Sequence, residues 1–172
     1  MKKTLKNIYL IGMIGVGKTS VGKILANKLH WAFVDVNETI EAIYGRSLKE
    51  IFLTFGEESF RNMETTILQE LSQGEHQVFA CNSDSVLDEG KLLTMKHTGV
   101  TIWLDAPFQD LLERIEKMKE PSVPEGDTSI VIQAMIEARK NYYKQADIRM
   151  STDQSTPEVM VEKIIQVLQQ IR

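Results

Sequence analysis

The sequence predicts an α/β protein: a three-layer α/β/α sandwich around a five-stranded parallel sheet. Short apolar runs of strand length alternate with longer segments in which apolar residues recur at helical spacing, which is typical of βαβ units. The chain has 172 residues, a usual length for one domain with one core. No internal repeat, low-complexity tract or Gly/Ser linker divides it, so residues 1–172 are predicted to form a single domain.

The hydrophobic pattern assigns the elements in order. Residues 7–11 are almost continuously apolar, as expected for a strand that is buried on both faces. The next segment has apolar residues at i, i+3, i+4 and i+8, the pattern of a helix: Val21, Ile24, Leu25 and Leu29. Gly45 and Gly56 are expected to end two short helices. The predicted strands are 7–11, 32–35, 77–81, 100–104 and 148–150. The predicted helices are 18–29, 38–44, 48–55, 57–71, 107–118, 130–146 and 159–171.

Composition and charge exclude several classes of protein. The net charge is -4 and the sequence pI is about 5.5, so a basic surface for nucleic acid is not expected. The single cysteine, Cys81, excludes an internal disulfide. No apolar run reaches the roughly 20 residues that span a membrane, and the first residues do not form a signal peptide. We therefore expect a cytoplasmic protein with no membrane partner, and its small size favours a monomer.

The strongest motif is a glycine-rich run between the first strand and the first helix. Residues 12–19 read Gly-Met-Ile-Gly-Val-Gly-Lys-Thr, a full match to the GxxxxGK[ST] pattern of a phosphate-binding loop, or P-loop. Such a loop points backbone N–H groups at an anion, and the helix N-terminus adds positive potential. Lys18 is expected to contact the β- and γ-phosphates of ATP, and the Thr19 hydroxyl to bind Mg²⁺. The predicted nucleotide-binding residues of this loop are Gly12, Gly15, Val16, Gly17, Lys18, Thr19 and Ser20.

Several further segments follow in a characteristic order and spacing. Residues 33–41 read Phe-Val-Asp-Val-Asn-Glu-Thr-Ile-Glu, and residues 56–64 read Gly-Glu-Glu-Ser-Phe-Arg-Asn-Met-Glu. Together with 45–52, 103–107, 111–114 and 138–147, they resemble the shikimate kinase family. The resemblance implies a fold like that of nucleoside monophosphate kinases, with a substrate-binding helical region at about 37–72 and a lid at about 117–128. It also implies transfer of the ATP γ-phosphate to the 3-hydroxyl of shikimate, with Mg²⁺.

The resemblance gives roles to two residues after the second strand. Asp35 matches the first carboxylate of the family's Asp-x-Asp, which helps to hold Mg²⁺ through water; alternatively it caps the next helix. Asn37 matches the second carboxylate, which contacts the acceptor hydroxyl and acts as base. An amide accepts a hydrogen bond but takes up no proton at neutral pH. The change therefore costs between little and roughly 10²–10⁴-fold in rate, and an N-cap for the helix at Glu38 is the alternative role.

Three arginines also match the family. Arg61 and Arg139 correspond to the pair that grips the acceptor carboxylate, for which forked guanidinium groups are suited. Glu64, three residues after Arg61, is expected to orient its guanidinium. Arg114 corresponds to the arginine that packs near the adenine. For each arginine the alternative is a solvated side chain on a helix surface.

The sequence departs from the family at two places. Asn82, Ser83 and Asp84 stand where the family has three glycines close to the substrate, and Ser83 is the predicted substrate contact among them. Asp84 adds negative charge where a carboxylate and a phosphate should approach; alternatively it turns outward and caps a helix at Ser85. The lid carries no arginine, and Lys117 or Lys119 would replace it without the forked geometry.

The sequence therefore supports one main function and two alternatives. The main hypothesis is an ATP- and Mg²⁺-dependent kinase that acts on shikimate or a related hydroxy acid. The first alternative is a catalytically impaired nucleotide-binding protein with a regulatory role, which the lost glycines and the lid favour. The second is a kinase for another small acceptor, such as a sugar acid, because the phosphate loop is shared by many kinases.

Overall fold

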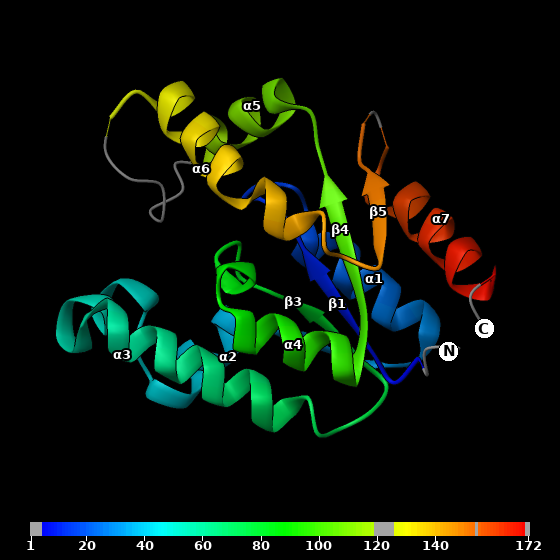
Figure 1. The fold of residues 1–172 in the computed structure, drawn as a ribbon, viewed down its shortest axis with the longest axis horizontal. Helices are drawn as coiled ribbons and strands as arrows, with labels where there is room; N and C mark the ends of the chain where they lie inside the picture. Colours follow the sequence, from blue (N-terminus) through cyan, green and yellow to red (C-terminus); the bar gives the residue numbers. More distant parts are fainter. Residues whose placement is uncertain (1–4, 119–125, 154, 171–172) are drawn as a thin grey trace.

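The computed structural model describes residues 5–118, 126–153 and 155–170. Five strands of this part of the chain form one sheet in the order β2-β3-β1-β4-β5, and each neighbouring pair is parallel. Figure 1 shows β1 in the middle of the molecule, between β3 and β4. The predicted five-stranded parallel sheet is confirmed. The strands are β1 (Asn7–Ile11), β2 (Ala32–Asp35), β3 (Gln77–Ala80), β4 (Gly99–Asp105) and β5 (Ile148–Ser151).

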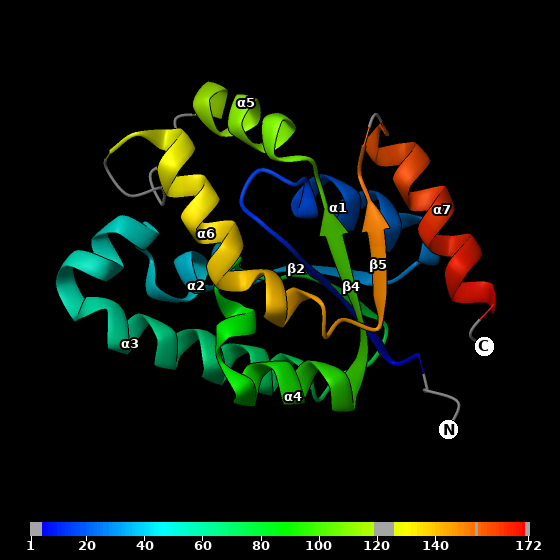
Figure 2. The same cartoon turned by 45° about the horizontal axis from the view of Figure 1, so that its top comes forward.

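Helices cover both faces of the sheet, which makes the predicted three layers. Helices α1 and α7 pack together on one face, and α4 lies on the other with α3 beside it (Figures 1 and 2). The described helices are α1 (Lys18–Leu29), α2 (Val36–Tyr44), α3 (Leu48–Leu71), α4 (Glu89–Thr98), α5 (Phe108–Met118), α6 (Thr128–Tyr143) and α7 (Pro157–Gln170). None of them is long and apolar enough to cross a membrane.

Most element boundaries lie within one or two residues of the predicted ones. Helix α3 is one hydrogen-bonded run, but Gly56 inside it has φ 80° and ψ 169°, which is not helical. The two helices predicted on either side of Gly56 are therefore the two arms of a kinked α3. Helix α4 is absent from the predicted elements, because Gly90 and few apolar residues leave its pattern weak.

The core centres on β1, whose side chains are all buried. Two of them are polar, and both bond to the ends of other elements. The Tyr9 hydroxyl lies 2.9 Å from the Ser72 hydroxyl and 2.6 Å from the Thr98 hydroxyl, at the ends of α3 and α4. The Asn7 amide donates to the Gly74 carbonyl at 2.8 Å. These bonds tie β1 to the segments around it.

The strand order sets where a ligand binds. The chain leaves β1 toward β2 and leaves β3 toward β4, so the connections run in opposite directions from two adjacent strands. In open parallel sheets, the crevice outside the carboxyl ends at such a switch point is the usual ligand site. The segments that begin there are the 12–19 loop after β1, Asp35 at the end of β2, and Asn82 to Asp84 after β3.

Candidate active site

The 12–19 loop has the curled backbone that the motif predicts. Gly12 has φ 143°, and a Cβ at this position would lie 2.4 Å from the Leu104 carbonyl oxygen, so only glycine fits. The loop turns back on itself: the Lys18 ammonium donates to the carbonyls of Gly12 and Met13 at 2.8 and 2.9 Å. Lys18 therefore lies across the loop, with its charge beside the curled backbone.

The remaining loop residues support this curl. Gly15 and Gly17 both have positive φ values, and Gly17 directly precedes α1. Val16 is buried and its N–H donates to the Met13 carbonyl at 3.3 Å. Ser20 is exposed in the first turn of α1. The N-terminus of α1 thus opens at the loop, where its dipole favours bound phosphate.

Asp35 contacts the loop from the end of the second strand and caps the next helix, which is one of the two roles that the sequence left open. The Thr19 hydroxyl donates to Asp35 Oδ2 at 2.9 Å. Asp35 Oδ1 accepts from the backbone N–H groups of Asn37 and Glu38 at 3.1 and 3.2 Å, which caps α2. Asn37 is not the N-cap, so that alternative is wrong.

The oxygens of Thr19 and Asp35 are the ligand type that Mg²⁺ prefers. No group of three or more His, Cys, Asp or Glu side chains in the described ranges is arranged to hold a metal by itself. Mg²⁺ in phosphoryl-transfer sites commonly keeps waters and takes one or two protein oxygens together with substrate phosphates. The pair therefore fits an ion that arrives with a nucleotide.

Arg61 and Arg139 converge on a single carboxylate, that of Asp84. Arg139 donates to Asp84 Oδ1 through Nε at 2.8 Å and also through Nη2, and Arg61 Nη2 donates to Asp84 Oδ2 at 3.2 Å. The two arginines come from α3 and α6, which are far apart in sequence. Asp84 makes no side-chain capping bond to the following 3₁₀ helix, Ser85–Leu87, so the outward, capping alternative is wrong.

Electrostatics keeps this carboxylate ionised. Burial alone would raise the pKa of Asp84, but hydrogen bonds and positive charge from Arg139, and then Arg61, outweigh burial and lower the pKa below its usual value. Partial burial opposes the charge on Arg61, yet Glu57 and Asp84 raise the pKa of its guanidinium. At neutral pH the cluster is two cations held by one anion, with a second anion on the outer side of Arg61.

The segment 82–84 is clamped on both sides. The Tyr143 hydroxyl, one turn after Arg139 on α6, donates to the Ser83 carbonyl at 2.9 Å. Asn82 Nδ2 lies 3.5 Å from Asn37 Oδ1, which brings the start of α2 next to this segment. Ser83 is 3% exposed, and its backbone carbonyl faces α6. The structure thus brings Asn37, Arg61 and Arg139 to the segment 82–84, which includes Ser83.

Glu64 does not orient Arg61, and that prediction is wrong. Its side chain is fully buried, and its carboxylate pairs with the equally buried Lys91 ammonium at 2.5 Å and accepts from the Ser85 hydroxyl at 2.5 Å. Glu57 orients Arg61 instead, by accepting from Nε at 3.0 Å and from Nη2 at 2.7 Å. The i+3 position faces the core here, whereas the i−4 position lies on the solvent side, and helical spacing alone does not distinguish the two.

Arg114 lies beside the phosphate loop. Its Nη1 is 3.4 Å from the Gly15 carbonyl oxygen, and its Nη2 is 4.0 Å from Asp110 one turn earlier on α5. Lys117 lies in the last turn of α5, at the start of the predicted lid. Lys119 and most of the lid, 119–125, fall outside the described residues.

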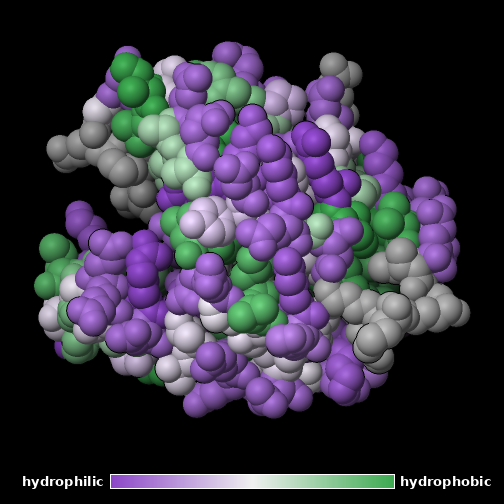
Figure 3. All heavy atoms as spheres, viewed as in Figure 1, coloured by the Kyte–Doolittle hydropathy of each residue, from purple (hydrophilic) through white to green (hydrophobic). Residues whose placement is uncertain are grey.

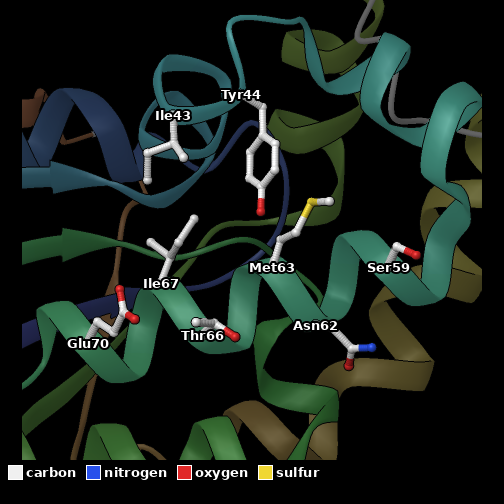
Figure 4. Close-up of a pocket in the computed structure, with 8 residues that line it drawn as sticks. All are labelled: Ile43, Tyr44, Ser59, Asn62, Met63, Thr66, Ile67 and Glu70. Carbon is white, nitrogen blue, oxygen red and sulfur yellow. The ribbon is translucent and has the colours of Figure 1, made fainter.

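A groove of about 410 Å³ lies away from these residues, between α2 and α3. Figure 4 shows Ile43 and Tyr44 of α2 facing Met63 and Ile67 of α3. None of its lining residues is a predicted site residue. On the face shown in Figure 3, hydrophilic side chains predominate and apolar ones gather in small separate groups.

Fold and site together define a class of protein. A five-stranded parallel sheet with a P-loop after its central strand, and a carboxylate beside the P-loop threonine, is the architecture of P-loop kinases. A cationic pair lies across the same carboxyl edge of the sheet, where an acceptor would bind.

Comparison with known proteins makes the class specific. The family model described as shikimate kinase matches residues 14–169. A shikimate kinase from Synechococcus elongatus is 35% identical, over 94% of this chain and 86% of its own length, and one from Persephonella marina is 35% identical over 94% and 98%. This chain belongs to the shikimate kinase family and is a kinase-type phosphotransferase.

Solved structures agree with this assignment. The shikimate kinase from Acinetobacter baumannii, in complex with shikimate, superposes with a TM-score of 0.92 at 29% identity, covering 98% of this chain and 95% of that one. The enzyme from Aquifex aeolicus gives 0.85 at 34% identity, covering 95% and 96%. A gluconokinase from Sinorhizobium meliloti, at 17% identity and a TM-score of 0.60, shares the fold alone.

Proposed function

We propose that this protein transfers the γ-phosphate of ATP, with Mg²⁺, to a hydroxyl of shikimate or a closely related carboxylated acceptor. One observation carries the proposal: Arg61 and Arg139, from two different helices, converge on one carboxylate, that of Asp84, in the segment after β3. A pair of forked cations is suited to a small carboxylate. The shikimate complex of the Acinetobacter relative supports the same acceptor class.

On this proposal, the nucleotide side of the site binds and neutralises. Bound MgATP supplies the phosphoryl group and a divalent charge. The loop residues Gly12, Gly15, Val16 and Gly17, with Ser20 at the start of α1, surround the phosphates, and Lys18 adds positive charge where negative charge develops. Thr19 and Asp35, whose side-chain oxygens lie 2.9 Å apart, would hold the ion, which would supply positive charge at the phosphates. Arg114 packs toward the adenine.

On the acceptor side, Asn37 positions the acceptor hydroxyl and does not remove its proton. Its amide oxygen accepts a hydrogen bond from the acceptor hydroxyl, which aligns that oxygen with the γ-phosphate. Phosphoryl transfer depends chiefly on alignment and charge neutralisation, so a strong base at this position is dispensable. Arg61 and Arg139 hold the acceptor carboxylate, and Ser83 lines the site between them.

The test is shikimate-dependent formation of ADP, measured with a coupled assay at millimolar acceptor. We expect a rate above the ATPase background. The variant Lys18→Ala should lower this rate by about 10²-fold or more, the usual cost of removing one preorganised charge at a transition state. Absence of shikimate-dependent turnover in the wild type, with MgATP binding intact, would contradict the proposal.

A second candidate, a nucleotide-binding protein with impaired catalysis, is favoured by Asn37 and by the Asp84 carboxylate on the two arginines. It predicts that the double variant Asn37→Asp with Asp84→Gly turns over shikimate while the wild type does not. The single domain, the monomeric state and the cytoplasmic location remain predictions of the sequence.

A further inference from the structure

Asp84 lies where the proposed acceptor carboxylate should bind. Each of the three nitrogens of Arg139 already donates: Nε and Nη2 to Asp84, and Nη1 to the Met135 carbonyl at 2.9 Å. Arg61 Nη2 divides its donation between Asp84 and Glu57. The Nε–Nη2 edge, which suits bidentate binding, is occupied on both arginines, by Asp84 on Arg139 and by Glu57 on Arg61. A second carboxylate therefore cannot bind Arg139 through this edge while Asp84 keeps its bonds.

The charges in the cluster lead to the same conclusion. Arg61 and Arg139 are balanced by Asp84 and Glu57, so the cluster is neutral as it stands. An acceptor carboxylate beside Asp84 would add an uncompensated negative charge, close to where the γ-phosphate must lie. Like charges at this range in a partly buried site repel strongly.

The Asp84 side chain can also rotate away from the two arginines. Its backbone has φ -90° and ψ -10°, an ordinary conformation, and its side chain is 25% exposed. The backbone on either side is held independently, by the Tyr143 bond to the Ser83 carbonyl and the Ser85 bond to Glu64. Rotation of one side chain therefore opens the pair without moving the segment.

We propose that Asp84 is an internal occupant of the acceptor-carboxylate site, which bridges Arg61 and Arg139 when no acceptor is bound and which a carboxylated acceptor must displace. This inference rests on the proposed function. It makes Asp84 a specificity-determining residue: it reduces the advantage that an acceptor gains from carrying a carboxylate, while a neutral acceptor of the same shape is affected little.

The test compares the affinities of two proteins for two ligands, as in a double-mutant cycle. Binding of shikimate and of its uncharged carboxamide is measured by calorimetry on the MgADP-loaded wild type and on Asp84→Asn. We expect Asp84→Asn to bind shikimate about 10- to 100-fold more tightly than the wild type, the range of one or two charge-assisted hydrogen bonds. The affinity for the carboxamide should change by less than about threefold.

Two controls separate displacement from a general charge effect. Glu57→Gln removes one negative charge from Arg61 but leaves the Asp84 bridge, so its effect on shikimate affinity should be smaller than that of Asp84→Asn. Glu75→Gln, an exposed carboxylate paired with Lys6 at 2.7 Å, should leave the affinity unchanged. Asp84→Gly is the second variant at the site, and thermal unfolding checks that each protein folds.

The outcomes distinguish this inference from the proposed function. Equal or weaker shikimate binding by both folded Asp84 variants overturns the inference, because Asp84 would then support the arginines and not compete for them. A parallel gain for the carboxamide overturns it too, since the effect would then not involve the carboxylate. Phosphate transfer by the wild type alongside either result leaves the proposed function standing. If Asp84→Asn binds shikimate more tightly but neither the wild type nor any variant transfers phosphate, the inference about Asp84 stands and the proposed function is overturned.

Discussion

At the scale of single residues, the most unusual group is a fully buried ion pair. Glu64 and Lys91 are 0% and 1% exposed, and Ser85 supplies a third partner to the carboxylate. Burying two charges is costly, and only close pairing with full hydrogen bonding offsets the lost hydration. Ser85 directly follows Asp84, so this trio anchors the segment that carries the Asp84 carboxylate.

Removing one member of this pair should be strongly destabilising. Lys91→Met leaves the Glu64 carboxylate buried with only a hydroxyl partner, and we expect a loss of about 3–5 kcal/mol in the free energy of unfolding. The double variant Glu64→Gln with Lys91→Met should lose less than the sum of the single variants, because no buried charge is left. Urea denaturation measures all three; a loss under 1 kcal/mol for Lys91→Met would contradict the argument.

At the scale of elements, the kink in α3 sets the position of Arg61. Gly56 separates the arm that begins with the Ser47–Glu50 capping box from the arm that carries Arg61. Glu57 begins the second arm and holds the Arg61 guanidinium. The backbone angles of Gly56 belong to a region that is essentially restricted to glycine, so the break is encoded by one residue.

Gly56→Ala should therefore destabilise the protein through the backbone alone. An added Cβ would meet nothing within 4 Å, so no steric clash contributes. The strain should cost about 1–3 kcal/mol, or about 2–4 °C in Tm per kcal/mol for a chain of this size. Glu58→Ala, an exposed helical position in the next turn, is the matched control and should leave Tm nearly unchanged. An equal Tm for the two variants would show that alanine adopts the backbone conformation of Gly56 without strain.

At the scale of the whole molecule, the proposed nucleotide site draws on segments that are distant in sequence. The loop after β1, the end of β2 and helix α5 meet at one edge of the sheet. Such a site does not exist in the unfolded chain, so a ligand that binds it stabilises the fold by mass action.

MgADP should accordingly raise Tm. At a concentration about 100 times its Kd, the stabilisation is about 2.7 kcal/mol, which corresponds to roughly 5–10 °C here. Lys18→Ala should reduce the shift sharply, because the charge over the loop is lost. Differential scanning fluorimetry gives both numbers, and a wild type unmoved by MgADP would count against the nucleotide site as a whole.

Local patterns determined the fold class and the phosphate loop. Apolar runs and helical spacing act through near neighbours, so they predicted the strands and most helices. The curl of the 12–19 run likewise depends on its own backbone. The break at Gly56 was predicted as the end of one helix before the next, because a single residue sets it, but the continuation of both arms as one kinked helix was not. Helix α4 was missed because its apolar face is too sparse to show a period.

The tertiary structure alone determined which side chains from distant segments contact one another. No spacing relates Arg61 on α3, Asp84 after β3 and Arg139 on α6, and their shared contact depends on how α3 and α6 approach the same strand end. The same holds for Glu64, whose buried partner Lys91 belongs to a helix with no clear pattern. A sequence shows which side chains are charged. Which oppositely charged side chain each one contacts depends on how distant segments pack together.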